Sequence, residues 1–165
     1  MESKWEEIYN VVKTKNLTAD GKSKLAIEFF LGKEWIEKTV DFVIELHNEF
    51  DLAVKCLQIL ESEHATDYAY NIYKESTRKD TSELAVFVIK EIAHPKSIKW
   101  VEEFLNQEHT AEFGLGLLDQ LLWCEKIEPN EETERLLTIA SEKLNGELIE
   151  QVDFIKDYLI QKSSS

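Results

Sequence analysis

The amino-acid sequence predicts an all-α fold of about ten short helices, stacked as antiparallel hairpins. Apolar residues recur at helical spacing along almost all of the 165 residues, and no segment shows sustained alternation of apolar and polar residues. Only 5 glycines and 2 prolines occur, so the chain lacks the turn residues on which β-rich folds depend. The length suits one domain, and we expect a single helical-repeat domain over residues 1–162 and a disordered tail over 163–165.

Six helices are expected in the first part of the chain. The second should end at Gly32, since glycine suits the residue after a helix. The sixth should begin with a capping box formed by Asp80 and Glu83, and it should stop before Pro95, which cannot continue a helix. The apolar stripes of these six helices span residues 5–12, 25–31, 35–46, 52–60, 65–73 and 84–92.

Four more helices are expected in the rest of the chain, with stripes over residues 98–105, 113–123, 136–144 and 148–159. The segment 128–130 contains Pro129 and separates the second of them from the third. Asn145 and Gly146 form a C-terminal cap for the third. The glycines at 114 and 116 are interpreted as small residues that allow a close helix contact, because a dinucleotide-binding loop needs a third glycine and a preceding strand.

A weak internal repeat indicates how the helices are stacked. Leu52-Ala53-Val54 recurs 32 residues later as Leu84-Ala85-Val86, and a third copy is suggested at Leu117, Leu118 and Leu122. A period of this length accommodates two short helices and two turns, which is the unit of an α-solenoid. We therefore expect a HEAT-like α-solenoid, with a compact irregular helical bundle as the alternative.

The sequence carries 33 acidic and 19 basic residues, a formal net charge of −14. Non-specific binding to nucleic acid or anionic lipid rests on Lys and Arg, so we expect neither nucleic acid nor a membrane as a partner. Residues 1–100 carry 18 acidic and 14 basic residues, whereas residues 101–165 carry 15 and 5. The acidic C-terminal part is either a well-solvated surface or a docking face for a basic protein.

Cysteines and the N-terminus indicate the compartment. Cys56 and Cys124 show neither CxxC nor zinc-ligand spacing, which fits a reducing environment. The first residues carry charge where a signal peptide needs an apolar core, and no apolar run has the length of a membrane span. We therefore expect a cytoplasmic protein.

The sequence shows no catalytic constellation. Glu61-x-x-His64 and Glu91-x-x-His94 match the Glu-x-x-His element of di-iron bundles. Such a site needs these pairs on the inward faces of long helices, whereas both histidines are expected at helix ends, so we interpret them as surface residues. No Gly-x-Ser-x-Gly occurs, and neither cysteine has a neighbouring histidine. We expect no catalytic residue, no metal site and no cofactor, and a protein that is not an enzyme.

The C-terminal third contains the candidate partner-binding residues. Asp119, Gln120 and Trp123 lie apart from the leucines that the helical pattern places in the core. Trp123 is either an interface residue or a core residue, and the pattern leaves this open. The acidic stripe of the last helix is either a solvated face or a site for Lys and Arg of a partner. The candidate set is Glu102, Glu103, Glu112, Asp119, Gln120, Trp123, Glu150, Asp153 and Asp157.

Two stretches of the chain resemble a known family. They are HPKSIKWVEEFL at 94–105 and FGLGLLDQLLW at 113–123, and FIKDYL at 154–159 fits the same pattern. These stretches resemble small bacterial HEAT-like immunity proteins encoded beside polymorphic toxins, including those of contact-dependent growth inhibition. The resemblance implies a binding protein, monomeric in a 1:1 complex, that blocks the active site of a toxin C-terminal domain. The acidic excess over 101–165 suits a nuclease toxin with a basic substrate cleft.

Two other functions stay open. A generic helical-repeat scaffold or adaptor for another basic protein would differ from an immunity protein in its partner and in the tightness of binding. An enzyme that used Glu61, His64, Glu91 and His94 would contain bound iron or manganese. A HEAT-like nucleic-acid repair enzyme would need a basic concave face, and the acidic composition of the chain argues against such a face.

Overall fold

The computed structural model describes residues 2–14, 21–46 and 50–163, and within them it contains ten α-helices, one 3₁₀ helix and no strand. The prediction of an all-α fold is confirmed. No helix among these residues is long and apolar enough to cross a membrane. The helices are α1 (Glu2–Thr14), α2 (Gly21–Leu31), α3 (Lys33–Ile44), α4 (Phe50–Leu60), α5 (Glu63–Glu75), α6 (Lys79–Ile92), η2 (Pro95–Trp100), α7 (Val101–Leu105), α8 (Ala111–Trp123), α9 (Glu131–Lys143) and α10 (Glu147–Ser163).

Capping residues place several helix ends where the sequence predicts them. Helix α2 ends at Leu31, and the following Gly32 has a φ of 78°, a conformation that favours glycine. Helix α9 begins after Asn130, whose side chain accepts a hydrogen bond from the Thr133 backbone N–H at 3.1 Å. Thr133 Oγ1 accepts one from the Asn130 N–H at 2.9 Å, which completes a capping box.

The predicted start of α6 is wrong. The helix begins at Lys79, so Asp80 lies within the first turn, and the N-cap residue Arg78 makes no side-chain capping bond. The preceding turn is shaped by Ser76, whose Oγ accepts a hydrogen bond from the Arg78 backbone N–H at 3.1 Å. A serine turn two residues before the N-cap thus sets the boundary that the Asp80–Glu83 pattern misplaced.

Residues 98–105 do not form one α-helix. They divide between the end of η2 and the short helix α7, which begins at Val101. Ala93, the C-cap of α6, has a φ of 48°, which turns the chain sharply before Pro95. The chain therefore continues after Pro95 in a tight 3₁₀ turn, which then widens into α7.

The chain divides into two compact units, residues 1–94 and 95–165. The expectation of one continuous repeat domain over residues 1–162 stays a prediction. Helix α10 extends to Ser163, and the last two residues of the expected tail lie outside the described residues.

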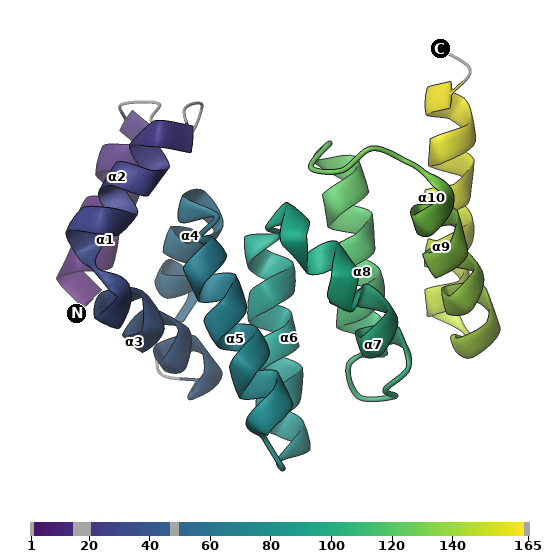
Figure 1. Cartoon of the computed structure of the whole chain (residues 1–165), viewed down its shortest axis with the longest axis horizontal. Helices are drawn as coiled ribbons and strands as arrows, with labels where there is room; N and C mark the ends of the chain where they lie inside the picture. The colour runs from purple at the N-terminus through teal and green to yellow at the C-terminus, as the bar shows by residue number, and fades with distance from the viewer. Residues whose placement is uncertain (1, 15–20, 47–49, 164–165) are drawn as a thin grey trace. The chain divides into compact units, whose positions relative to one another are not determined.

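In the first unit, the helix pairs α3–α4 and α5–α6 form the centre. Helices α5 and α6 lie side by side, α3 contacts α5, and α4 contacts α6 (Figure 1). Helix α1 packs on α4, and α2 packs on α3 and α4. The repeated apolar positions are buried at equivalent places of α4 and α6, namely Ala53, Val54, Leu57 and Leu60 and their counterparts Ala85, Val86, Ile89 and Ile92.

Trp5 anchors α1 to this centre. Its side chain is fully buried, and its Nε1 donates a hydrogen bond to Thr39 Oγ1 at 3.1 Å. Its ring centroid lies 4.5 Å from that of Phe42. The Cys56 thiol donates to the Trp5 carbonyl oxygen at 3.2 Å, and burial raises the pKa of this thiol to about 12. At neutral pH Cys56 is therefore an inert, protonated thiol.

We expect a disulfide reagent to modify one cysteine of the folded protein and both cysteines of the unfolded protein. Cys124 is exposed, whereas Cys56 is buried. In a spectroscopic thiol titration near neutral pH, Cys124→Ser should abolish the reaction of the folded protein and leave one reactive thiol in denaturant. Rapid modification of Cys56 in the native Cys124→Ser variant would contradict its burial.

In the second unit, α8 packs closely against α7. Gly114 of α8 is buried, and a Cβ atom at this position would lie 2.9 Å from the Phe104 Cβ and 3.2 Å from the Leu105 backbone nitrogen. The prediction that this glycine permits a close helix contact is confirmed. Helix α9 contacts α7, and α10 contacts both α8 and α9.

Gly114→Ala should destabilise the protein by about 1–3 kcal/mol, because the added methyl group collides with the α7 backbone. Chemical denaturation measures this loss. Gly116→Ala is the matched control, since Gly116 lies on the same helix but is partly exposed, and helix propensity alone would favour alanine there. Equal effects of the two substitutions would contradict the proposed collision.

Candidate protein-binding surface

Trp123 ends helix α8 with 58% of its surface exposed. Its ring packs against Tyr158 of α10, with ring centroids 5.1 Å apart and planes inclined by 42°. Phe154, one turn before Tyr158, is also exposed, at 59%. The exposure of Trp123 excludes the alternative in which it is a core residue. A large, rigid aromatic pair open to solvent is typical of the residues that carry binding energy at protein interfaces.

Polar contacts fix α10 against α8 beside this aromatic pair. The Gln151 Nε2 donates a hydrogen bond to Asp119 Oδ2 at 3.2 Å, and Lys162 Nζ lies 2.8 Å from Glu125 Oε1. These contacts advance in the same direction along both helices, so α8 and α10 run parallel. We call Asp119, Gln120, Trp123, Glu150, Phe154, Asp157 and Tyr158 the α8–α10 surface.

The predicted acidic stripe of α10 keeps to one side of the helix. Successive residues of an α-helix are rotated by about 100°, which places Glu150, Asp153 and Asp157 within about 60° of one another. Within this stripe, Glu150 and Asp157 lie nearer to Phe154 than Asp153 does. All three carboxylates are exposed. The α8–α10 surface thus presents an aromatic centre with two exposed carboxylates on its α10 flank.

Glu102 belongs to a different cluster. Arg135 of α9 lies 2.7 Å from the Glu102 carboxylate and 2.9 Å from that of Glu132. The hydrogen bonds from Arg135 lower the pKa of both glutamates, so both are ionised at neutral pH and share one guanidinium. Much of the charge of Glu102 is therefore offset within the molecule.

Of the other predicted residues, Gln120 and Glu112 lie on the face of α8 that carries Asp119, and Glu112 is exposed in the first turn. Glu103 is half-buried on α7. Asp119 and Trp123 contact α10 directly.

Two residues of the α8–α10 surface, Phe154 and Tyr158, were not among the candidates, nor was Gln151, which donates to Asp119. Phe154 and Tyr158 are spaced i, i+4 outside the apolar stripe of the last helix, and this spacing is the signal that could have identified them. Helical periodicity could not show which helix Tyr158 packs on, because that depends on contacts between segments that are distant in the sequence.

The histidines lie at helix ends, as the sequence predicts. His64 is the second residue of α5, and its Nε2 lies 2.8 Å from Glu37 Oε1, while Glu61 forms an ion pair with Lys24 at 2.9 Å. His94 follows the C-cap of α6. Among the described residues, no group of three or more His, Cys, Asp or Glu side chains is arranged to hold a metal ion. His47 lies outside those residues.

Comparison with known proteins returns no matching family model, no matching curated protein and no matching solved structure.

Proposed function

We propose that this protein is an immunity protein that binds a basic toxin domain through the α8–α10 surface and covers the toxin's active site. The single observation that carries the binding role is the exposed Trp123, packed on the half-buried Tyr158, together with the exposed carboxylates of Glu150 and Asp157. The aromatic pair supplies area that a partner can desolvate, and the carboxylates favour a partner bearing Lys or Arg. The nature of the partner, a toxin domain, rests on the sequence resemblance alone.

We also propose a HEAT-like stack of two-helix repeats as the architecture that presents this surface. Two features of the first unit support it. Helices α3 and α5 contact each other, as do α4 and α6, which is the layering that stacked pairs would produce. The positions related by the 32-residue repeat are buried on α4 and on α6.

The test of this function uses the full chain as bait in lysate of its source, at low and at high salt, with mass spectrometry of the retained proteins. We expect one basic protein at 1:1 stoichiometry, retained best at low salt, whose toxicity or enzymatic activity falls when this chain is added. Retention of several unrelated proteins would instead indicate an adaptor. A captured protein whose activity is unchanged by saturating amounts of this chain would contradict the immunity role.

Charge reversal tests the acidic flank of the surface. Glu150→Lys with Asp157→Lys should slow association with the basic partner by about tenfold at low salt and flatten the dependence of the rate on ionic strength. The control is Glu108→Lys with Glu142→Lys, two exposed positions of the same unit that change the net charge equally. Surface plasmon resonance at several salt concentrations measures both, and equal slowing by the two double variants would argue against this flank.

A further inference from the structure

Helix α2 exposes large apolar side chains and turns charged ones inward. Leu25, Phe29 and Phe30 are exposed by 67%, 82% and 86%. Lys24 and Glu28, on a neighbouring side of the helix, face the connection between α4 and α5. Exposed apolar side chains occur singly on most soluble proteins, but three on one helix form a patch that commonly marks an interaction site.

The inward polar contacts define how α2 is rotated. The Lys24 ammonium lies 2.9 Å from Glu61 Oε2, and only 14% of the Lys24 side chain is exposed. The Ser62 hydroxyl donates a hydrogen bond to Glu28 Oε1 at 2.6 Å and accepts one from the Ala65 backbone N–H at 3.0 Å. Rotating α2 to bury Phe29 would break both contacts and leave partly buried charges unpaired. The outward position of Leu25 and Phe29 is therefore specified by the structure.

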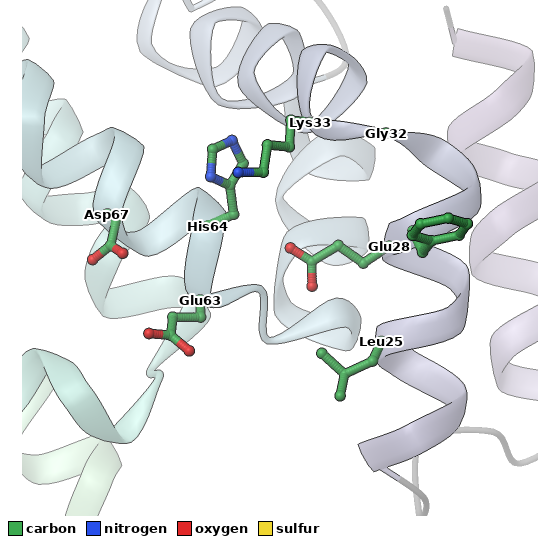
Figure 2. A pocket seen from close by; sticks show the side chains of 8 residues that line it. Leu25, Glu28, Gly32, Lys33, Glu63, His64 and Asp67 are labelled. Atoms are coloured by element: carbon green, nitrogen blue, oxygen red, sulfur yellow. The ribbon is translucent and has the colours of Figure 1, made fainter.

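A groove runs from this exposed side of α2 to the first turns of α5. It encloses about 640 Å³, within the range of about 300–1,000 Å³ for binding clefts. Leu25 and Phe29 form its apolar wall. Figure 2 shows Leu25 and Glu28 extending from α2 into the space that faces Glu63, His64 and Asp67. Among the described residues that line it, Glu28, Glu63 and Asp67 contribute carboxylates and Lys33 contributes an ammonium group.

We propose that this groove binds a peptide segment of another protein in which an aromatic or aliphatic side chain lies beside Lys or Arg. The apolar side chain would pack on Leu25 and Phe29, and the cation would approach the carboxylates across the groove. A second copy of this chain fits less well, because a symmetric pair would bring Glu63 and Asp67 close to the same carboxylates of its partner. An anionic lipid surface is repelled by the same charges.

This site lies in the first unit, whereas the α8–α10 surface lies in the second. The proposal therefore does not depend on the proposed function, and either can fail without the other.

The probe is a synthetic amphipathic peptide of about 14 Leu and Lys residues, a length that presents several helical turns to a groove. Two matched peptides carry Ser in place of every Leu, or Glu in place of every Lys. Each is titrated into the ¹⁵N-labelled full chain, and amide shifts locate the binding site. The chain variant is Leu25→Ser with Phe29→Ser, and the control is Val11→Ser, an exposed apolar residue of the same unit that does not line the groove. Thermal melts verify that both variants fold.

We expect the Leu/Lys peptide to shift amides of residues 24–33 and 61–67, and the Ser and Glu peptides to bind at least about tenfold more weakly. The double variant should lose at least about tenfold in affinity, whereas Val11→Ser should bind as the wild type does. Equal binding by the double variant and the wild type would overturn the proposal, as would shifts confined to α8 and α10. Concentration-dependent dimers that the double variant abolishes would assign the face to a second copy and also overturn it.

Discussion

Trp123→Ala is expected to weaken binding of the partner by about 2 kcal/mol or more, roughly thirtyfold, with little change in stability. More than half of the Trp123 side chain is exposed, so its removal opens no cavity in the core. The lost affinity reflects the area that the indole and the neighbouring Tyr158 offer to a partner. Titration calorimetry with the captured partner measures the affinity, and denaturant unfolding of the free chain measures the stability.

Trp123→Phe is the matched variant, because it keeps an aromatic ring against Tyr158 and should recover part of the affinity. A loss of several kcal/mol of stability on Trp123→Ala, with unchanged affinity in the folded fraction, would show that the indole is a structural residue.

Trp5→Ala is expected to destabilise the first unit by about 3–5 kcal/mol, since it removes a fully buried indole. The substitution also removes the Nε1 group that donates to Thr39 Oγ1 and the indole ring that packs against Phe42. Trp5→Phe should cost less, because a ring still fills most of the volume and only the hydrogen bond is lost. Chemical denaturation with the thiol reactivity of Cys56 as a second readout reports on this unit, because Cys56 contacts the Trp5 backbone.

A Trp5→Ala protein with the stability of the wild type and an unreactive Cys56 would contradict the role of Trp5 as the anchor of α1. The pair of tryptophan variants thus separates a residue that holds the fold from one that is available to a partner. Both tryptophans occur in helical stripes, and only their exposure distinguishes them.

Helical periodicity predicted where the helices lie, because the helical spacing of apolar residues is a local signal that each segment carries by itself. Gly32 marked a helix end for a local reason that the sequence contains. The predicted Asn145–Gly146 cap is not formed, since α9 ends at Lys143 and its C-cap Leu144 is extended. The start of α6 was misplaced because Ser76, rather than Asp80, shapes the preceding turn.

The sites were harder to predict than the helices, because they depend on contacts between distant segments. The run over residues 25–31 is apolar on most sides, so the sequence could not tell that Lys24 and Glu28 face inward and Phe29 outward. That rotation is decided by Glu61 and Ser62, more than 30 residues later. Likewise, the sequence could not determine whether Trp123 is exposed, because its exposure depends on how α10 packs beside α8.

Under the proposed function, a basic partner docks on the α8–α10 surface. Amide hydrogen exchange of the full chain, with and without the captured partner at low salt, tests this docking. We predict that the partner slows exchange over residues 119–125 and 150–160. We expect no slowing of comparable size over residues 79–92, which form α6 of the first unit. Protection confined to residues 1–94, with exchange of α8 and α10 unchanged in the complex, would contradict the claim.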